Sequence, residues 1–184
     1  MTELRREEFY IMSLAIKSCA IYIENMQSKR ANLTPPIDNM ICFSVYAAGL
    51  AFNRLYKNVL DQFNLTYPQF LVLVALQQRG PLNVGALGEA LYLESNTLTP
   101  LLKRMEAAGL VLRRRSHVDE RVVHVSLTAA GKTLARNIGC VPPQVLAATH
   151  MGLREVSQLT ANLNGLAKQL RKHTQTLDNE ISTT

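Results

Sequence analysis

The stretch of sequence that decides the fold is residues 93–128, LESNTLTPLLKRMEAAGLVLRRRSHVDERVVHVSLT. Its first part predicts a helix, because apolar side chains recur every three or four residues along one face: Leu98, Leu101, Leu102 and Met105. Ser95 is suited to be the N-cap, since its hydroxyl can accept an orphan backbone N–H. Pro100 is expected within the first turn or so, where a missing N–H costs little, and Gly109 is expected to end the helix.

Two short runs rich in β-branched residues follow this helix. They are VLRRR at 111–115 and RVVHVSL at 121–127, on either side of SHVDE, and they predict a hairpin with a charged tip. Basic side chains are concentrated here, since six lie within nineteen positions: Lys103, Arg104, Arg113, Arg114, Arg115 and Arg121. The pattern is that of a helix followed by a basic wing.

Two further helices are predicted upstream. Thr66 and Pro68 begin the first, which is almost wholly apolar and therefore core, and Gly80 ends it. Asn83 is suited to cap a second, short helix, and only about three residues then separate that helix from the one at Ser95. Two short helices joined by so tight a turn are typical of a helix-turn-helix.

These elements predict a mainly α-helical fold with a small β-wing, in which residues 66–128 form a winged helix-turn-helix domain. Asp38 is suited to cap a long helix within residues 38–65, which is apolar on more than one side and is expected to be buried between other helices. Residues 1–37 form an N-terminal extension that is expected to be helical, with a role that the sequence leaves open.

The C-terminal residues 129–184 are expected to form further helices. Thr128 is suited to cap the first, and Pro142–Pro143 is expected to break the chain. Within Arg154–Lys172, apolar residues alternate at spacings of three and four: Val156, Leu159, Leu163, Leu166 and Leu170. Such a seam suits a partner helix or the chain's own domain equally. Because the winged domain is too small to bury both flanking sets of helices, a homodimer built from both termini is favoured.

Composition and charge limit the classes of function that the chain can have. The chain has 184 residues, 47% hydrophobic and 18% charged, which is ordinary globular composition, and its formal net charge of +6 favours an anionic partner. Its three cysteines are widely separated and its histidines do not pair at ligand spacing, so neither a metal site nor a disulfide-stapled secreted domain is predicted. A reducing cytoplasm is the expected location.

An apolar run at residues 9–23 is interrupted by Lys17 and is shorter than the roughly 20 residues that span a bilayer. No cleavage site typical of a signal peptide follows it. A packing or tail helix is favoured over a signal peptide, and a true start nearer Met26 or Met40 stays open. No membrane partner is predicted.

Double-stranded DNA is the expected partner of the helix and wing. The helix would present a polar set to the major groove: Ser95, Asn96, Thr97, Thr99, Lys103 and Arg104. Short hydroxyl and amide groups can approach base edges, with Asn96 suited to adenine, while Lys103 and Arg104 favour phosphate. The alternative is that Ser95 and Thr97 only cap the helix, and the two roles are compatible.

The wing supplies further candidate contacts, from Arg113 and Arg115 on its first strand. Arg121 at the tip could enter a minor groove, with Asp119 holding its guanidinium by a bidentate pair. A simple exposed salt bridge is the alternative, and beside a helix-turn-helix the groove contact is favoured.

The residues from the long helix at 38 to the C-terminal helix at 172 resemble a known family. The helix and wing are similar to those of the MarR family of winged-helix regulators, and closer still to its organic-hydroperoxide-sensing, OhrR-type branch. The resemblance covers about residues 38–172 and is carried by ICFSVYAA at 41–48, LTYPQFLVL at 65–73, GALGEALYL at 85–93, TLTPLLKRMEAAGLVLRRRS at 97–116 and DER at 119–121.

The residues themselves give Cys42 two features of a reactive thiol. It follows Asp38 by four positions, near a helix N-terminus whose partial positive charge stabilises a thiolate, and Tyr46 lies at i+4 on the same face. Tyr56 is fourteen residues on, about 21 Å along a straight helix, so a bend or a second subunit would be needed to bring it to Cys42. The alternative is an inert core cysteine.

The resemblance implies more. OhrR-type proteins have their peroxide-reactive cysteine at the position of Cys42, and their two sulfur-bonding tyrosines match Tyr46 and Tyr56. The family implies oxidation to sulfenic acid, then a disulfide, and loss of DNA affinity.

The sequence departs from the family at two places. The second cysteine of some relatives would fall near Ala147 and is absent, so Cys140, Cys19 or a low-molecular-weight thiol would have to serve as the resolving partner. Asn96 replaces the usual glycine and Glu94 replaces the usual aspartate, so the resemblance does not specify which operator sequence is recognised.

The sequence therefore predicts a homodimeric repressor without a cofactor or enzymatic activity, which binds a pseudo-palindromic operator and releases it when organic hydroperoxide oxidises Cys42. A regulator that responds to a small aromatic ligand, with Cys42 incidental, is the alternative. A thiol peroxidase is disfavoured, because no base, metal or resolving pair typical of turnover is evident.

Overall fold

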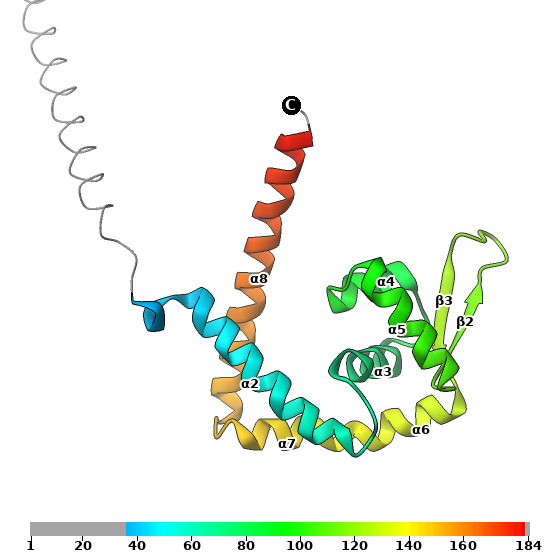
Figure 1. Ribbon diagram of the computed structural model, residues 1–184, viewed down its shortest axis with the longest axis horizontal. Helices are drawn as coiled ribbons and strands as arrows, with labels where there is room; N and C mark the ends of the chain where they lie inside the picture. The colour runs from blue at the N-terminus through cyan, green and yellow to red at the C-terminus, as the bar shows by residue number, and fades with distance from the viewer. Residues whose placement is uncertain (1–35, 183–184) are drawn as a thin grey trace, which may run out of the picture. The chain divides into compact units, whose positions relative to one another are not determined.

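The computed structural model describes residues 36–182 of the chain (Figure 1). It divides into two units, Met1–Ala51 and Phe52–Thr184, which are described separately. The expected helix of the N-terminal extension and the apolar run at 9–23, with Cys19, lie outside the described residues.

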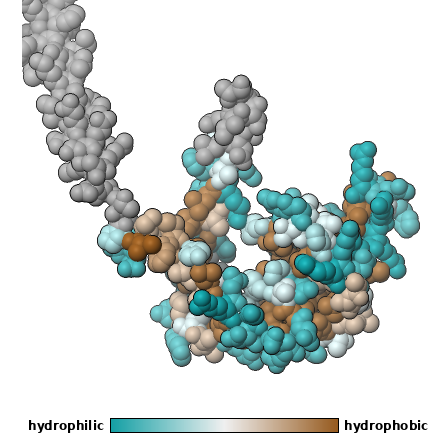
Figure 2. Space-filling model, viewed as in Figure 1, coloured by the Kyte–Doolittle hydropathy of each residue, from teal (hydrophilic) through white to brown (hydrophobic). Residues whose placement is uncertain are grey.

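In the first unit, a 3-10 helix η1 (Ile37–Asn39) precedes α2 (Ile41–Asp61), whose residues 41–51 belong to this unit. Asp38 lies within η1, so the prediction that it caps the long helix is wrong. The large apolar side chains on α2 before its last turn are exposed or half-exposed in the single chain, among them Ile41 at 66%, so their burial against other helices stays a prediction. Figure 2 shows this apolar surface at the start of α2.

The second unit holds the winged helix-turn-helix, as predicted. Its helices are α3 (Tyr67–Arg79), α4 (Val84–Leu91) and α5 (Ser95–Ala107). Its strands are β1 (Leu82–Asn83), β2 (Val111–Arg115) and β3 (Val123–Leu127), which pair antiparallel in the order β1-β3-β2. The two-residue β1 was not predicted, and it makes the sheet three-stranded.

Local signals set the helix ends. The side chain of Gln69 accepts a hydrogen bond from the Thr66 backbone N–H at 2.8 Å and so caps α3, and Asn83 accepts one from the Ala86 N–H at 2.7 Å at the start of α4. Gly80 ends α3 with a φ of 76°, in the region that favours glycine. The predicted core face of α5 is confirmed, since all four of its apolar residues are buried: Leu98, Leu101, Leu102 and Met105.

Thr128 ties the wing to the end of α5. Its hydroxyl donates to the Gly109 carbonyl at 2.6 Å, and its backbone N–H donates to the Leu110 carbonyl at 3.1 Å. The same hydroxyl oxygen accepts from the Gly131 N–H at 3.0 Å and caps α6 (Ala129–Asn137), as predicted. A Cβ at Gly131 would collide with the Leu110 carbonyl, so the start of α6 packs directly on the chain leaving α5.

The C-terminal path differs from the prediction in one respect. A 3-10 turn η2 (Ile138–Cys140) joins α6 to α7 (Val141–Ala148), and Pro142–Pro143 occupies the first turn of α7 instead of breaking the chain. Proline fits there because first-turn N–H groups need no helical partner. After α7, α8 runs Leu153–Ser182, well beyond the predicted end at Lys172.

Within residues 36–182, no helix is long and apolar enough to cross a membrane, and no group of histidine, cysteine or acidic side chains is placed to hold a metal ion.

Candidate DNA-binding surface and thiol site

The exposed side of α5 carries most of the residues predicted to meet DNA. Thr99 is half-buried. The other predicted residues of α5 are exposed to solvent: Ser95, Asn96, Thr97, Lys103 and Arg104. The N-cap is Glu94 and not Ser95, because Ser95 already lies inside the helix; the capping prediction was wrong by one residue. Pro100 lies in the second turn of α5 instead of the first, so the Asn96 carbonyl lacks its usual helical partner.

A chain of hydrogen bonds orders the start of α5. The Thr97 hydroxyl donates to the Asn96 side-chain oxygen at 3.1 Å, and the Asn96 amide donates to the Glu94 carboxylate at 3.2 Å. Glu94 and Asn96, the two residues of this segment that depart from the family pattern, therefore bond each other. The Asn96 amide has two N–H donors, so it can keep this bond to Glu94 and still donate to a base edge.

The wing tip is held by side chain to backbone hydrogen bonds. Ser116 Oγ accepts from the Val118 N–H at 3.2 Å, and the Asp119 carboxylate accepts from the Arg121 backbone N–H at 2.9 Å. The predicted bidentate pair between Asp119 and the Arg121 guanidinium is absent, because Asp119 forms a local turn with the backbone instead. The Arg121 side chain is exposed at the tip.

Arg113 has a different environment from the other wing arginines. Its guanidinium lies 3.6 Å from the Glu106 carboxylate, with a side chain that is 20% exposed. This is the one ion pair among the described residues. Arg114 and Arg115, on the same strand β2, are exposed. A DNA contact from Arg113 stays a prediction, and sequence reasoning missed Glu106 as its partner.

Cys42 is the second residue of α2, and its thiol is free and exposed. The structure thus places the thiol at a helix N-terminus, closer to the first N–H groups than the sequence suggested. Tyr46 is exposed one turn later, and its ring lies 6.4 Å from that of Phe43. Within residues 36–182 no hydrogen bond joins the Tyr46 hydroxyl to Cys42.

Tyr56 belongs to the second unit and lies in an aromatic cluster. Its ring centroid is 4.3 Å from that of Tyr67 and 5.7 Å from that of Phe70. Burial, and then the neighbouring Tyr67 phenol, raise the pKa of Tyr56, and burial raises the pKa of Tyr67. Cys140 is a free, exposed thiol at the end of η2, and its sulfur donates to the Asn137 carbonyl at 3.4 Å.

Comparison with known proteins identifies the family. Residues 54–138 match the family model of the SarA/Rot transcriptional regulators. The chain is 45% identical over 134 residues to the HTH-type transcriptional regulator TtmR of Methylorubrum extorquens, over 73% of this chain and 69% of that protein. It is 40% identical over 136 residues to the organic hydroperoxide resistance transcriptional regulator of Bacillus subtilis, over 74% of this chain and 92% of that protein. The chain belongs to the MarR family of winged-helix transcriptional regulators.

Solved structures of AbfR from Staphylococcus epidermidis resemble this MarR-family chain. Overoxidized AbfR bound to DNA is 31% identical with a TM-score of 0.59, over 80% of this chain and 98% of AbfR. Reduced AbfR bound to DNA has the same identity and coverage with a TM-score of 0.58. AbfR with its disulfide formed is 33% identical with a TM-score of 0.52, over 78% of this chain and 98% of AbfR.

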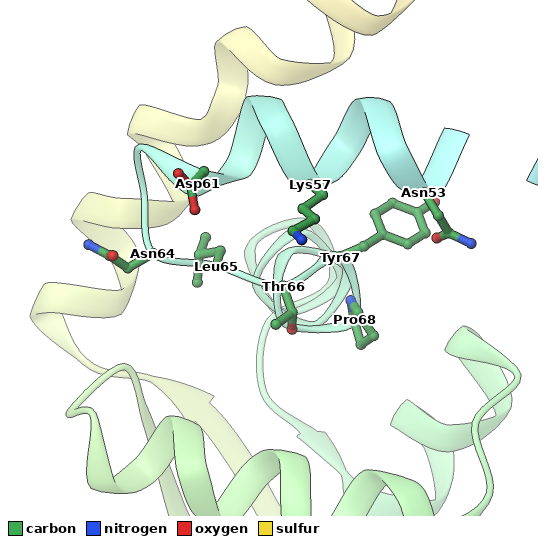
Figure 3. A pocket seen from close by; sticks show the side chains of 8 residues that line it. All are labelled: Asn53, Lys57, Asp61, Asn64, Leu65, Thr66, Tyr67 and Pro68. Carbon is green, nitrogen blue, oxygen red and sulfur yellow. The ribbon is translucent and has the colours of Figure 1, made fainter. Parts of the chain in front are cut away.

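The MarR-family chain also has a hollow between the end of α2 and the start of α3 (Figure 3). Its volume is about 450 Å³, and it is lined by Asn53, Lys57, Asp61, Asn64, Leu65, Thr66, Tyr67 and Pro68. Figure 3 shows Lys57 reaching from α2 toward the start of α3. No sequence pattern pointed to this hollow, because its residues come from two helix ends and the loop between them.

Proposed function

We propose that this MarR-family regulator is a homodimeric, redox-responsive DNA-binding repressor that leaves its operator when an organic hydroperoxide oxidises Cys42. One observation carries the proposal: an exposed thiol stands at the N-terminus of α2, in the same chain as a winged helix with an exposed basic face. The similarity to the organic hydroperoxide resistance regulator of Bacillus subtilis supports it.

The exposed residues of α5 and the wing suit duplex DNA. Lys103 and Arg104 flank the polar side chains at the start of α5 and can neutralise phosphates, while those polar groups reach base edges in the major groove. Arg121 stands free at a wing tip whose backbone is fixed by Asp119. A guanidinium so displayed fits a narrow minor groove.

The dimer is supported by apolar surface that the described chain leaves uncovered. On α8 the predicted leucine seam does not pack on its own domain, and three of its members are exposed: Leu159, Leu163 and Leu170. The start of α2 exposes a second apolar set, Ile41, Val45, Tyr46 and Leu50. Exposed patches of this kind on a soluble fold mark an interface, so we assign both helices to the contact between subunits. In that dimer the partner's Tyr56 is the candidate second ligand of the Cys42 sulfur.

The chemistry follows from the thiol. The Cys42 thiolate attacks the terminal oxygen of the hydroperoxide, and the O–O bond breaks to give sulfenic acid and an alkoxide. The alkoxide takes a proton from solvent and leaves as the alcohol. A second thiol then attacks this sulfur, forming a disulfide and releasing water. Cys140, Cys19 and a low-molecular-weight thiol are the candidates for that second thiol.

The solved structures of AbfR bear on the step at which DNA is released. Both the reduced and the overoxidized forms of AbfR are bound to DNA. By analogy, added sulfur oxygens alone would not release this regulator, and we assign release to the disulfide stage. A bulky sulfur substituent at the start of α2 can change how two dimer helices pack, whereas extra oxygens add little volume.

A mobility-shift experiment tests the proposal. Wild-type protein and the Cys42→Ser variant are mixed with DNA from upstream of the chain's own coding region and with a low-molecular-weight thiol such as cysteine, with and without cumene hydroperoxide. Wild-type protein should release the DNA only with the oxidant, and Cys42→Ser should stay bound in both conditions. Release of Cys42→Ser as readily as wild type would show that Cys42 is not the sensor.

A second candidate is regulation by a small aromatic ligand, favoured by the hollow beside Lys57. An ammonium and the Tyr67 phenol there suit an aromatic carboxylate. If salicylate released the DNA from wild type and Cys42→Ser alike, but not from Lys57→Met, this second function would replace the first.

A further inference from the structure

We propose that the C-terminal half of α8 is a second DNA-contacting surface, in which Lys168, Arg171 and Lys172 bind phosphates beside the recognition helix α5. The inference rests on the proposed DNA binding and dimer, and it concerns residues that lie outside the winged helix-turn-helix.

One contact fixes where this part of α8 lies. The Arg171 guanidinium stacks over the Tyr92 ring, with its central carbon 3.8 Å from the ring centroid. Tyr92 is the left-handed C-cap of α4, with a φ of 55°, and it stands three residues before Ser95 in the turn of the helix-turn-helix. The stacked pair therefore holds the basic side of α8 against the turn that leads into the DNA-reading helix.

The three cations share one side of α8. Spacings of three and four residues place Lys168, Arg171 and Lys172 together, because they are about one helical turn apart. The exposed leucines of α8, such as Leu163 and Leu170, point to roughly the opposite side at 100° per residue. A dimer that buries the leucine seam would leave the basic side outward, next to the helix-turn-helix.

The charges on this side are available. All three side chains are exposed, and none of them forms an ion pair with another side chain that the structure describes. Together with Gln169 and Gln175 they line a shallow hollow along the helix. This surface consists of cationic and amide side chains, is open to solvent, and lies beside the helix-turn-helix. It therefore suits a phosphate backbone and does not suit an apolar partner.

The salt dependence of operator binding tests this surface. The operator duplex from the mobility-shift experiment is titrated by fluorescence anisotropy with wild type, Lys168→Gln and Lys172→Gln between low and moderate salt. Each lost phosphate contact lowers the slope of log K against log salt by about 0.9, so each substitution should lower it by about 1.8 in a dimer. Both substitutions leave Arg171, which stacks on Tyr92, in place.

Arg154→Gln is the matched control. Arg154 is exposed and lies five turns before Lys172 on the same side of α8, about 27 Å away, and the variant loses the same single charge. It should keep the wild-type slope. If the two lysine variants also keep the wild-type slope, or if Arg154→Gln loses as much as they do, the surface does not contact phosphate. Absence of operator binding by wild type would overturn the proposed function itself, and is recognisable before any variant is measured.

Discussion

Glu106 holds Arg113 by two contacts, one to its backbone and one to its side chain. One carboxylate oxygen accepts from the Arg113 backbone N–H at 2.9 Å, and the other lies 3.6 Å from the guanidinium. Glu106 is near the end of α5 and Arg113 is the middle residue of β2, so the pair joins the recognition helix to the wing. The Arg113 side chain is only 20% exposed beside Glu106, which favours a role as a brace over a role as a phosphate ligand.

The brace predicts coupled effects of substitutions at the two positions. Arg113→Ala and Glu106→Ala should each lower the free energy of unfolding by about 1 kcal/mol, and the double variant should lose little more than either single variant. Urea unfolding of the four proteins measures this. Arg115→Ala, with its exposed side chain, serves as the control and should not alter stability. Strictly additive losses would contradict the brace.

Arg121→Ala should weaken operator binding by about tenfold or more, because the wing then has no cation at its tip to enter the minor groove. Anisotropy titration at fixed salt measures the change. Arg136→Ala removes an exposed arginine from α6 and should bind as wild type does. Equal losses from the two variants would mean that only total charge matters.

Asp119→Asn should bind DNA nearly as well as wild type, whereas Asp119→Ala should bind several-fold more weakly. The reason is that the Asp119 oxygen accepts from the Arg121 N–H, and an asparagine oxygen can do the same without a charge. Comparing the operator affinities of the two variants shows whether Asp119 acts by holding the turn or by forming an ion pair. Were Asn as damaging as Ala, the charge of Asp119 would be acting on the guanidinium after all.

The Tyr56–Tyr67 pair predicts a loss of stability at high pH. Burial raises the pKa of both phenols above the value of about 10 that they have when unfolded, so the folded state holds their protons more tightly. Their contribution is therefore full below pH 10 and falls as the pH rises through the folded pKa values. Unfolding at pH 8 and pH 11 should show this loss, and Tyr56→Phe should reduce it. A Tyr56→Phe protein with the wild-type pH dependence would contradict it.

Much of the winged domain could be predicted because its signals are local. The apolar spacing of α5 reports burial directly, and Thr66, Asn83 and Thr128 act as caps within a few residues of themselves. The features missed depend on chain segments that meet in space. β1 is a strand only because Leu82 pairs with Val125, and Glu106 matters only because β2 returns beside α5.

The flanking helices show a different limit. An apolar face on α2 predicts burial but does not say by what, and in one chain that face stays exposed. Pro142–Pro143 predicts a break in the chain, but in the structure the same residues begin α7, directly after the η2 turn. The exposed position of Cys42 followed from neither pattern.

The hydrogen bonds of Thr128 limit what a chemical signal can change in the protein. Because one threonine bonds the end of α5, the end of the hairpin and the start of α6 at once, the wing cannot swing without the recognition helix. In the proposed dimer each winged helix-turn-helix would then move as a rigid piece, and a signal at α2 could alter only the distance and angle between the two winged domains. In that case oxidised protein keeps its preference for each half-site and loses its match to their separation. Operators with altered spacers would be the ones that the oxidised form still recognises.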